Sequence, residues 1–478
     1  MNRDTRLKTT TACIAIAGLS VCASALADGL KDPLPDSFTF AGVTLYGTID
    51  VGYAYQSEGV PLNSKYVGGL EYQAFTTTRN FSGSQSTLAE SGLEQSKIGL
   101  KVDMPVSSDF NIVGRLETGF NPLSAELTNA CQAMVDNSGV AQGRQTANAD
   151  SSRCGQPFNS QAFGGVASKT FGQLTIGRHN SLQLDALAQY DPQVLSYAFS
   201  FLGYSGFDGG AGSTQAARWD NSVRYSYQNG PIHFAAMFSD GGTDTGILGR
   251  AYAGQVGTSF HNLSLDAVYE KENGAVNLRS SFDNMANPVP TPGLAAYASN
   301  DESWNIMGKY AFDFGAGGSA PPGDKLVLFA GYSHIQKAHS SEPGGFSEGD
   351  YPISIGITIN DSAEYSLEWV GARYMMATGL NLTGAYYHVS QNSWTIGLGP
   401  TGTQGIGCSG AGLLCAGDFN EASFSADYVF NKHYDVYAGI NYSQVTDGLA
   451  NGFAGTTKDG TTGSEDQTTV MVGFRVKF

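Results

Sequence analysis

The sequence carries little charge for its length and, after its first 27 residues, has no long apolar run. Charged residues make up 14% of the 478 positions, against a usual share of about 25%. A helix that crosses a bilayer needs about 20 mostly apolar residues in a row, and no stretch after residue 27 comes near that length. This absence excludes a helical membrane protein.

Basic residues are scarce as well. The chain has 26 Lys and Arg against 43 Asp and Glu, which gives a formal net charge of −17. Nucleic-acid phosphates are bound by basic surfaces, so we expect no nucleic-acid partner. The acidity is equally compatible with a well-solvated surface and by itself indicates no function.

Motifs of catalysis and metal binding are missing too. The seven histidines are scattered without HExxH or another metal-ligand spacing, and no GxSxG sequence is present. The glycine-rich runs "GFDGGAGS" and "GAGGSAPPGD" lack the Lys-Ser/Thr pair of a phosphate-binding loop. The sequence therefore predicts no catalysis, no metal and no cofactor.

The N-terminus has the pattern of a secretory signal peptide. Arg3, Arg6 and Lys8 precede the uncharged run "TTTACIAIAGLSVCASALA", which ends in the small-x-small pattern Ala-Leu-Ala. Its apolar core is short for a membrane anchor. We therefore expect residues 1–27 to be removed before Asp28 and the remaining chain to be exported.

The sequence has only six cysteines, and Cys13 and Cys22 lie within the predicted signal peptide. Four cysteines allow three disulfide connectivities, and an oxidising compartment favours disulfides over free thiols. Local pairing is the expectation, with free or cross-paired thiols as the alternative, and each couple lies in a Gly/Ser/Asn-rich stretch that it would staple. The candidates are Cys131 with Cys154, and Cys408 with Cys415.

What the sequence does have is apolar residues at every second position, the period of a β-strand with one buried face. In the C-terminal "VMVGFRVKF", apolar Val470, Val472 and Phe474 alternate with Gly473 and Arg475. Sixteen segments of this kind are predicted strands: 43–55, 94–104, 109–119, 158–168, 171–178, 219–228, 231–239, 250–260, 263–273, 303–314, 325–337, 362–376, 380–390, 421–430, 434–445 and 467–478.

The connections between these segments alternate between short and long. Tight turns such as "PVSS", "NGP", "HN", "ATG" and "NKH" separate connections of some 20 to 40 residues. Such alternation is typical of an outer-membrane barrel, which also removes the sheet edges that lipid cannot tolerate. We predict an all-β fold: a 16-stranded antiparallel transmembrane β-barrel over 43–478, with short periplasmic turns, long extracellular loops and a lead-in at 28–42.

Several segments resemble the general porins of Gram-negative bacteria, especially those of β-proteobacteria. They are "VTLYGTIDVG", "SKIGLKVDMP", "RLETGFNP", "FGQLTIGRH", "ARWDNSVRYSY" and the terminal Phe478. The resemblance implies a homotrimeric, water-filled channel in the cell outer membrane for passive diffusion of small hydrophilic solutes and ions. It also implies contact with the lipid bilayer and lipopolysaccharide, and recognition of Phe478 as an assembly signal by the barrel-assembly machinery.

The third long loop, 179–218, differs from the others. From residue 180 to 217 it has no Lys or Arg, carries Asp185, Asp191 and Asp208, and contains the apolar run "VLSYAFSFLGYSGF". Contiguous exposed apolar surface invites association, so we expect this loop to fold inward, and the resemblance implies that it narrows the pore. The alternative is a loop packed at a contact between subunits.

Opposite an acidic loop the resemblance places a basic wall, and strand parity supplies the candidates. The inward residues are Lys97, Lys101, Arg115, Arg218 and Arg224, with Glu117 among them. These five basic groups only slightly outnumber the inward carboxylates, which are Glu117, Asp103, Asp220 and any loop aspartates that point inward, so we expect a weak anion preference.

Three finer expectations follow from parity and from the resemblance. Ser160 stands where relatives commonly carry Arg. Arg178 falls on the lipid side unless Gly177 bends its strand. Lys97 faces either Glu117 or Arg115, and the first is favoured because opposite charges stabilise a cross-strand pair.

Two other classes of function are alternatives to a diffusion channel. A barrel enzyme such as a lipase needs a Ser-His pair on the barrel exterior, and no predicted strand offers one. The features above are shared by an adhesin or receptor that acts through the long loops and by a substrate-preferring channel. The sequence does not identify a ligand for either.

Overall fold

The computed structural model describes residues 34–35, 37–57, 84–129, 132, 153–203, 217–241, 250–278, 294–314, 323–340, 346–348, 351–359, 362–393, 395–398, 405–407, 416–446 and 465–478. The predicted signal peptide, 1–27, lies outside these ranges. Among the helices in them, none is both long enough and apolar enough to cross a membrane.

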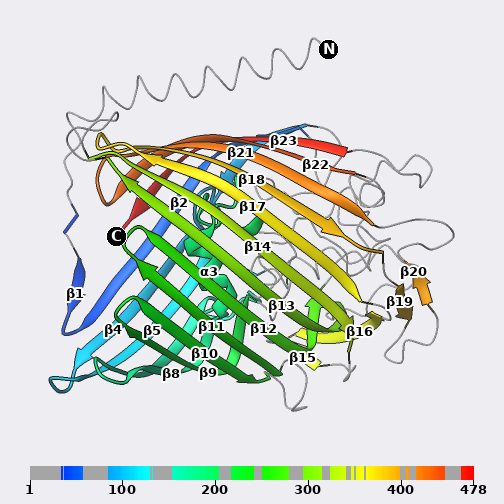
Figure 1. The fold of residues 1–478 in the computed structure, drawn as a ribbon, viewed down its shortest axis with the longest axis horizontal. Coiled ribbons are helices and arrows are strands. Elements are labelled where there is room, and N and C mark those ends of the chain that lie inside the picture. The colour runs from blue at the N-terminus through cyan, green and yellow to red at the C-terminus, as the bar shows by residue number, and fades with distance from the viewer. Residues whose placement is uncertain are drawn as a thin grey trace, which may run out of the picture.

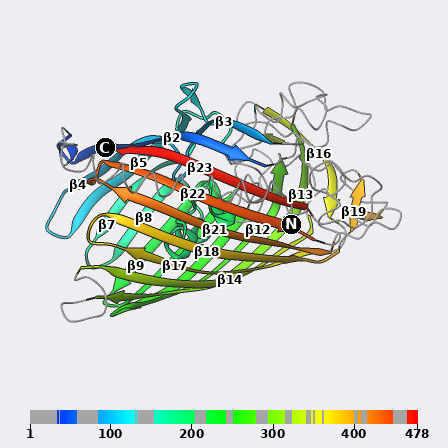
Figure 2. The same ribbon diagram turned by 90° about the horizontal axis from the view of Figure 1, so that it is seen from above.

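Sixteen antiparallel strands form the wall of a closed barrel, which confirms the predicted fold (Figures 1 and 2). Each of the sixteen predicted segments overlaps one wall strand. The wall strands are β2 (Val43–Gln56), β4 (Lys97–Pro105), β5 (Phe110–Asn121), β7 (Gln161–Ser168), β8 (Gly172–Asn180), β9 (Arg218–Asn229), β10 (Ile232–Asp240), β11 (Arg250–Phe260), β12 (Leu263–Leu278), β13 (Leu294–Asp313), β14 (Lys325–His339), β17 (Ala363–Met375), β18 (Leu380–Gln391), β21 (Gly417–Val429), β22 (Tyr434–Val445) and β23 (Glu465–Lys477).

Shorter elements decorate this wall. β13 and β14 are among the longest strands, and β16 pairs in parallel with the start of β13 and antiparallel with β19, so a small sheet extends the wall at the long-loop end. The short elements are β1 (Phe38–Phe40), β3 (Gln85–Glu90), β6 (Glu126–Leu127), α3 (Leu182–Tyr190), the 3-10 helix η2 (Phe201–Gly203), β15 (Phe346–Glu348), β16 (Tyr351–Ile359), β19 (Thr395–Leu398) and β20 (Gly405–Gly407).

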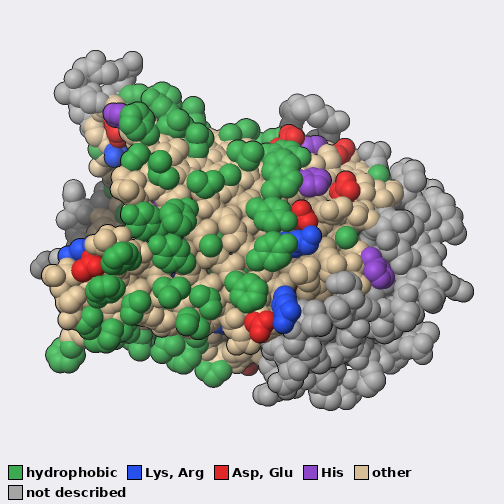
Figure 3. All heavy atoms as spheres, turned by 60° about the horizontal axis from the view of Figure 1, so that its bottom comes forward, with side chains coloured by type: hydrophobic (Ala, Val, Ile, Leu, Met, Phe, Trp, Pro, Cys, Tyr) green, Lys and Arg blue, Asp and Glu red, His purple; other side chains and the backbone are tan. Residues whose placement is uncertain are grey.

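Alternation along the wall strands separates an apolar exterior from a polar interior. In β10, Phe234 and Phe238 are 42% and 49% exposed on the outside, whereas Ala235 and Met237 are buried inside. Figure 3 shows apolar side chains spread over the side of the barrel, with most charged side chains toward its ends. An apolar outer band of this kind is what a bilayer requires of a spanning barrel.

The first and last wall strands close the barrel. β2 pairs with β23 from Thr48↔Lys477 to Gln56↔Thr469. Phe478 continues this ladder, because its backbone N–H and C=O bond to Gly47 at 3.0 and 2.9 Å. Beyond it β1 pairs with the start of β2, and the ring of Phe38 packs edge-on against that of Phe478. We call this junction the seam.

Deleting Phe478 should lower the fraction of folded protein. The deletion removes both backbone bonds to Gly47 and the ring contact with Phe38 at the point where the barrel closes. The measurement is the heat-modifiable band on unheated gels, with Phe260→Ala, an exposed aromatic at the turn end away from the seam, as the control. A deletion variant that folds as well as the control would contradict the role of Phe478.

Candidate functional site

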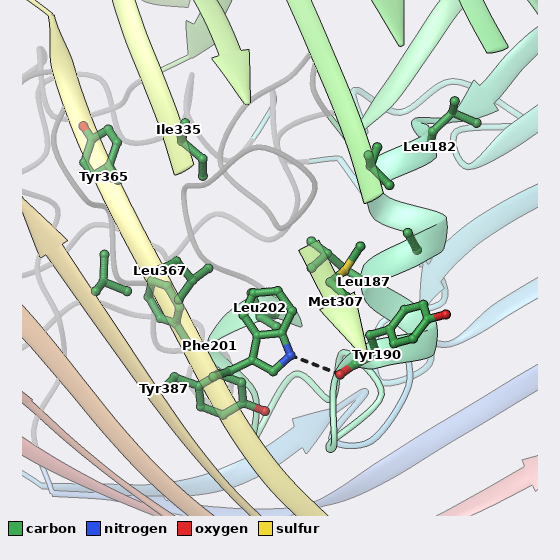
Figure 4. Packing of buried hydrophobic residues seen from close by; sticks show 14 of the residues in the cluster. Leu182, Leu187, Tyr190, Phe201, Leu202, Met307, Ile335, Tyr365, Leu367 and Tyr387 are labelled. Carbon is green, nitrogen blue, oxygen red and sulfur yellow. Dashed lines mark hydrogen bonds between the residues drawn. The ribbon is translucent and has the colours of Figure 1, made fainter. Parts of the chain in front are cut away.

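The third loop, 181–217 between β8 and β9, lies inside the barrel over its described part (Figures 1 and 4). Its apolar side chains pack against the inner faces of β13, β14, β17 and β18, and the indole N–H of Trp369 donates to the carbonyl of Tyr190 at 3.0 Å. A fully buried large apolar side chain contributes about 1.5–3 kcal/mol. The buried residues that the loop supplies to this cluster are Leu182, Ala186, Leu187, Tyr190, Phe201 and Leu202.

The backbone N–H groups in the first turn of helix α3 donate hydrogen bonds both to the loop and to the barrel wall. Ser181 is the N-cap, and its hydroxyl accepts from the N–H of Leu184. A wall residue, Glu270 of β12, accepts from the N–H of Gln183 at 2.7 Å. Carboxylates at a helix N-terminus are favoured by the helix dipole, so Glu270 fixes the helix to the wall.

Asp191 follows the helix, and its carboxylate is buried within the loop rather than directed at the lumen. The residue is 1% exposed and accepts hydrogen bonds from the hydroxyls of Tyr387 and Ser200 and from the N–H groups of Leu195 and Gln193. Burial raises the pKa of Asp191, an effect that these donors oppose. The prediction that Asp191 supplies pore charge is therefore wrong; its carboxylate ties the loop to β18.

Two cavities flank the loop. The first has a volume of about 490 Å³, and the second, of about 470 Å³, extends toward the turn end at His261 and Lys325. Both are lined by Ala188, Val194 and Arg373. The third loop therefore lies between two water-accessible spaces. We use the term constriction for the edge of this loop that faces the lumen together with the wall residues that line the first cavity opposite it.

Ten of the described residues that line the first cavity are charged, and among these ten the basic groups outnumber the acidic ones by six to four. They come from the loops and from β4, β5, β9, β17, β21 and β23, which are distant in sequence. The basic residues are Lys97, Arg115, Arg153, Arg218, Arg373 and Arg475, and the acidic residues are Glu94, Glu117, Asp185 and Asp427.

The structure brings five of the sequence candidates to this cavity, namely Lys97, Arg115, Arg218, Glu117 and Asp185. Two others lie close by or along the same wall. Arg224 does not line the cavity but pairs with Asp185 at 2.5 Å, and Lys101 faces Arg115 across the β4–β5 ladder. Asp208 lies outside the described residues.

The predicted register between β4 and β5 is wrong. Lys97 faces Gly119, and Glu117 faces Gly99, because the hairpin turn is longer than expected and closes with a bond from Val106 N–H to Phe110 C=O. Lys97 and Glu117 therefore find their polar partners on residues other than each other. Lys97 pairs with Glu94 at 2.6 Å, and Tyr46 on β2 donates to Glu117 at 2.8 Å.

Sequence reasoning missed five charged residues of this cavity: Glu94, Arg153, Arg373, Asp427 and Arg475. Arg475 lies on the inward face that alternation predicts for the last strand, so parity alone could have added it. It bonds Asp435 at 3.0 Å and lies 3.6 Å from Glu94. Arg153 has no such signal, because it belongs to a long loop. Its guanidinium donates to Ser160, the position where relatives commonly carry Arg.

Glu94 reaches the lumen because the second wall strand is interrupted between β3 and β4. Residues 91–96 leave the ladder, and the buried carboxylate of Asp50 accepts from the N–H groups of Leu93 and Glu94 at 2.8 and 2.9 Å. The N–H of Ala198 in the third loop donates to the carbonyl of Gly92. The interruption is therefore a docking point for the third loop.

Arg178 is buried beside a bend at Gly177 in β8. Gly177 has φ 142°, the ladder shifts register between Gly177 and His179, and a Cβ at Gly177 would lie 2.2 Å from the carbonyl of Ala162. Arg178 then donates to Asp220 at 2.7 Å and to the carbonyl of Asn159. Bulges of this type re-aim side chains beside functional sites.

Of the four candidate cysteines, only Cys154 lies within the described residues. Cys154 is disulfide-bonded, whereas Cys131, Cys408 and Cys415 lie outside the described residues, so the pairing stays a prediction. Within the part of the chain that the structure describes, no group of three or more His, Cys, Asp or Glu side chains is placed to hold a metal ion.

Comparisons with known proteins agree with this architecture. The chain is 21% identical over 274 residues to an outer membrane porin protein of Bordetella pertussis, which covers 57% of this chain, and it spans 61% of that relative's length. Its fold is similar to an anion-selective porin from Comamonas acidovorans (16% identity, 91% and 99% of the two chains, TM-score 0.54) and to OmpT, an outer membrane protein of Vibrio cholerae (13%, 93% and 100%, TM-score 0.51). The model of the Gram-negative porin family matches residues 9–448, and the chain therefore belongs to the Gram-negative porin family.

Proposed function

We propose that the chain forms a water-filled channel in the cell outer membrane, through which small hydrophilic solutes and ions diffuse passively and without catalysis, with a weak preference for anions. The observation that carries this proposal is the constriction, where a loop held inside a closed barrel lies beside a cavity with ten charged lining residues. In this proposal residues 1–27 direct export, and the third loop narrows the channel.

The anion preference rests on the balance of charge. Among the described residues that line the cavity, six basic and four acidic side chains give a formal charge of +2, although the whole chain is acidic. Between low-dielectric walls a fixed charge acts more strongly than in bulk water, and charges beyond a Debye length of about 8 Å at physiological salt are screened. The similar Comamonas protein is named an anion-selective porin, which supports the same sign.

The proposed partners follow from the family and from the surface. We infer a homotrimer in contact with the lipid bilayer and lipopolysaccharide, assembled with the barrel-assembly machinery through a signal that includes Phe478. The apolar outer band supports a lipid environment, and OmpT of Vibrio cholerae also exists in a trimer form.

In planar bilayers the purified protein should insert in discrete conductance steps. With a KCl gradient across the membrane, the zero-current potential should take the sign of chloride preference and grow as the salt concentration falls, because screening weakens. Absence of conductance steps would overturn the channel, and a potential of the potassium sign would overturn the anion preference.

A further inference from the structure

We propose that Arg153 is a selectivity-determining residue of the constriction and that the disulfide at Cys154 positions it there. This inference rests on the proposed function, since it concerns the charge that ions meet on passing the third loop. Arg153 lies outside the wall strands, and the disulfide of Cys154 is separate from the hydrogen bonds that join those strands.

Arg153 reaches the cavity from the long connection between β5 and β7. It is 4% exposed, and its guanidinium donates to the hydroxyl of Tyr197 in the third loop at 3.3 Å and to that of Ser160 at 3.2 Å. It lines the same cavity as Lys97, Arg115 and Arg218. Its charge therefore lies where the third loop, the wall and the root of another loop meet.

The neighbouring residue explains how a loop side chain is held at this point. Cys154 is disulfide-bonded and buried, bridges to Asn129 across the root of the loop, and donates its N–H to the side chain of Gln156 at 2.8 Å. Consecutive Cα atoms are 3.8 Å apart, so a constraint on Cys154 also limits where the backbone of Arg153 can lie.

The other basic residues of the cavity are not held in place by a disulfide. Breaking the disulfide at Cys154 should therefore move only the Arg153 side chain away from the cavity. Lys97, Arg115, Arg218, Arg373 and Arg475 belong to β4, β5, β9, β17 and β23, whose backbones are fixed by ladder hydrogen bonds. Without the disulfide, a long loop gains conformational entropy, and the guanidinium leaves Tyr197 and Ser160. The wall charges remain in place.

The test compares variants with the wild type by their chloride-to-potassium permeability ratio. Arg153→Gln keeps a hydrogen-bonding side chain without the charge, and Cys154→Ser keeps the charge without the disulfide. Each should lower the ratio by a factor of roughly 2 to 5, the effect of one charge at a few ångströms in water. The double variant should lower it no further, because both changes remove the same charge from the site. Arg153→Lys should retain most of the wild-type ratio.

Cys408→Ser combined with Cys415→Ser removes the other cysteine couple and should leave the ratio unchanged. Adding a thiol reductant to folded wild-type channels during recording should reproduce the effect of Cys154→Ser without any refolding step, and it should have no effect on Arg153→Gln. A wild-type ratio in Arg153→Gln, in Cys154→Ser or in reduced channels would overturn the proposal, as would additive effects in the double variant. Each variant is compared with the wild type, so the test of Arg153 remains valid even if the wild type prefers cations. A cation preference of the wild type would overturn only the proposed anion preference.

Discussion

Replacing both Lys97 and Arg115 with glutamate should turn the channel from anion-preferring to cation-preferring. Each replacement changes the charge by two units, so the formal charge summed over the described lining residues goes from +2 to −2. With charges acting over a few ångströms, the chloride-to-potassium permeability ratio should fall by about tenfold or more. The reversal should be largest at low salt.

A matched control separates the site from the net charge of the chain. Lys169→Glu combined with Lys432→Glu makes the same change in net charge on two exposed turns at the periplasmic end, and it should leave the permeability ratio close to the wild-type value. If the control shifts the ratio as far as the constriction variant does, the residues of the cavity do not set selectivity.

Asp191→Ala should release the third loop and produce larger, fluctuating single-channel conductance. The carboxylate accepts from Tyr387, Ser200, Leu195 and Gln193, and each buried donor left unpaired costs about 1–3 kcal/mol. The total cost for the four donors is comparable with the free energy contributed by the buried apolar side chains that hold the loop. Single-channel recording measures the conductance, and limited proteolysis reports whether the loop has become accessible.

Asp191→Asn keeps the size of the side chain and one acceptor oxygen, so it should have an intermediate effect. Asp240→Ala removes a carboxylate that is 67% exposed at the barrel rim and should change neither conductance nor proteolysis. Wild-type conductance in Asp191→Ala would show that the apolar cluster alone holds the loop in place.

The strands could be predicted from the sequence because one physical constraint acts on every residue of the wall. A spanning strand has lipid on one side and water on the other, so period-2 alternation marks both its existence and its inward face. Lys97, Arg115 and Glu117 were found in this way, and Arg475 could have been. Parity is a weaker guide where the ladder is irregular, as at the register shift between Gly177 and His179, beside which Arg178 is buried although parity assigns it to the lipid side.

The rest of the site depends on contacts between distant segments, which alternation does not encode. Asp191 and Asp185 are both loop aspartates in the sequence, but one is buried against Tyr387 whereas the other lines the cavity. The interruption that places Glu94 at the lumen rests on Asp50, a residue of another strand. Arg153 depends on the closure of a loop, and no local pattern reports that closure.

The seam also determines when this protein can finish folding. Its ladder joins Thr48 to Lys477, 477 minus 48 or 429 positions apart, so it forms only after nearly the whole chain has been made. Until then the outermost strands keep unpaired N–H and C=O groups, which can pair with other chains and cause aggregation. β1 forms a local hairpin with β2 and can cover the start of that edge early, but the remainder waits for β23. A chain that stops before its last strand is therefore an open sheet with two free edges, rather than a slightly smaller channel.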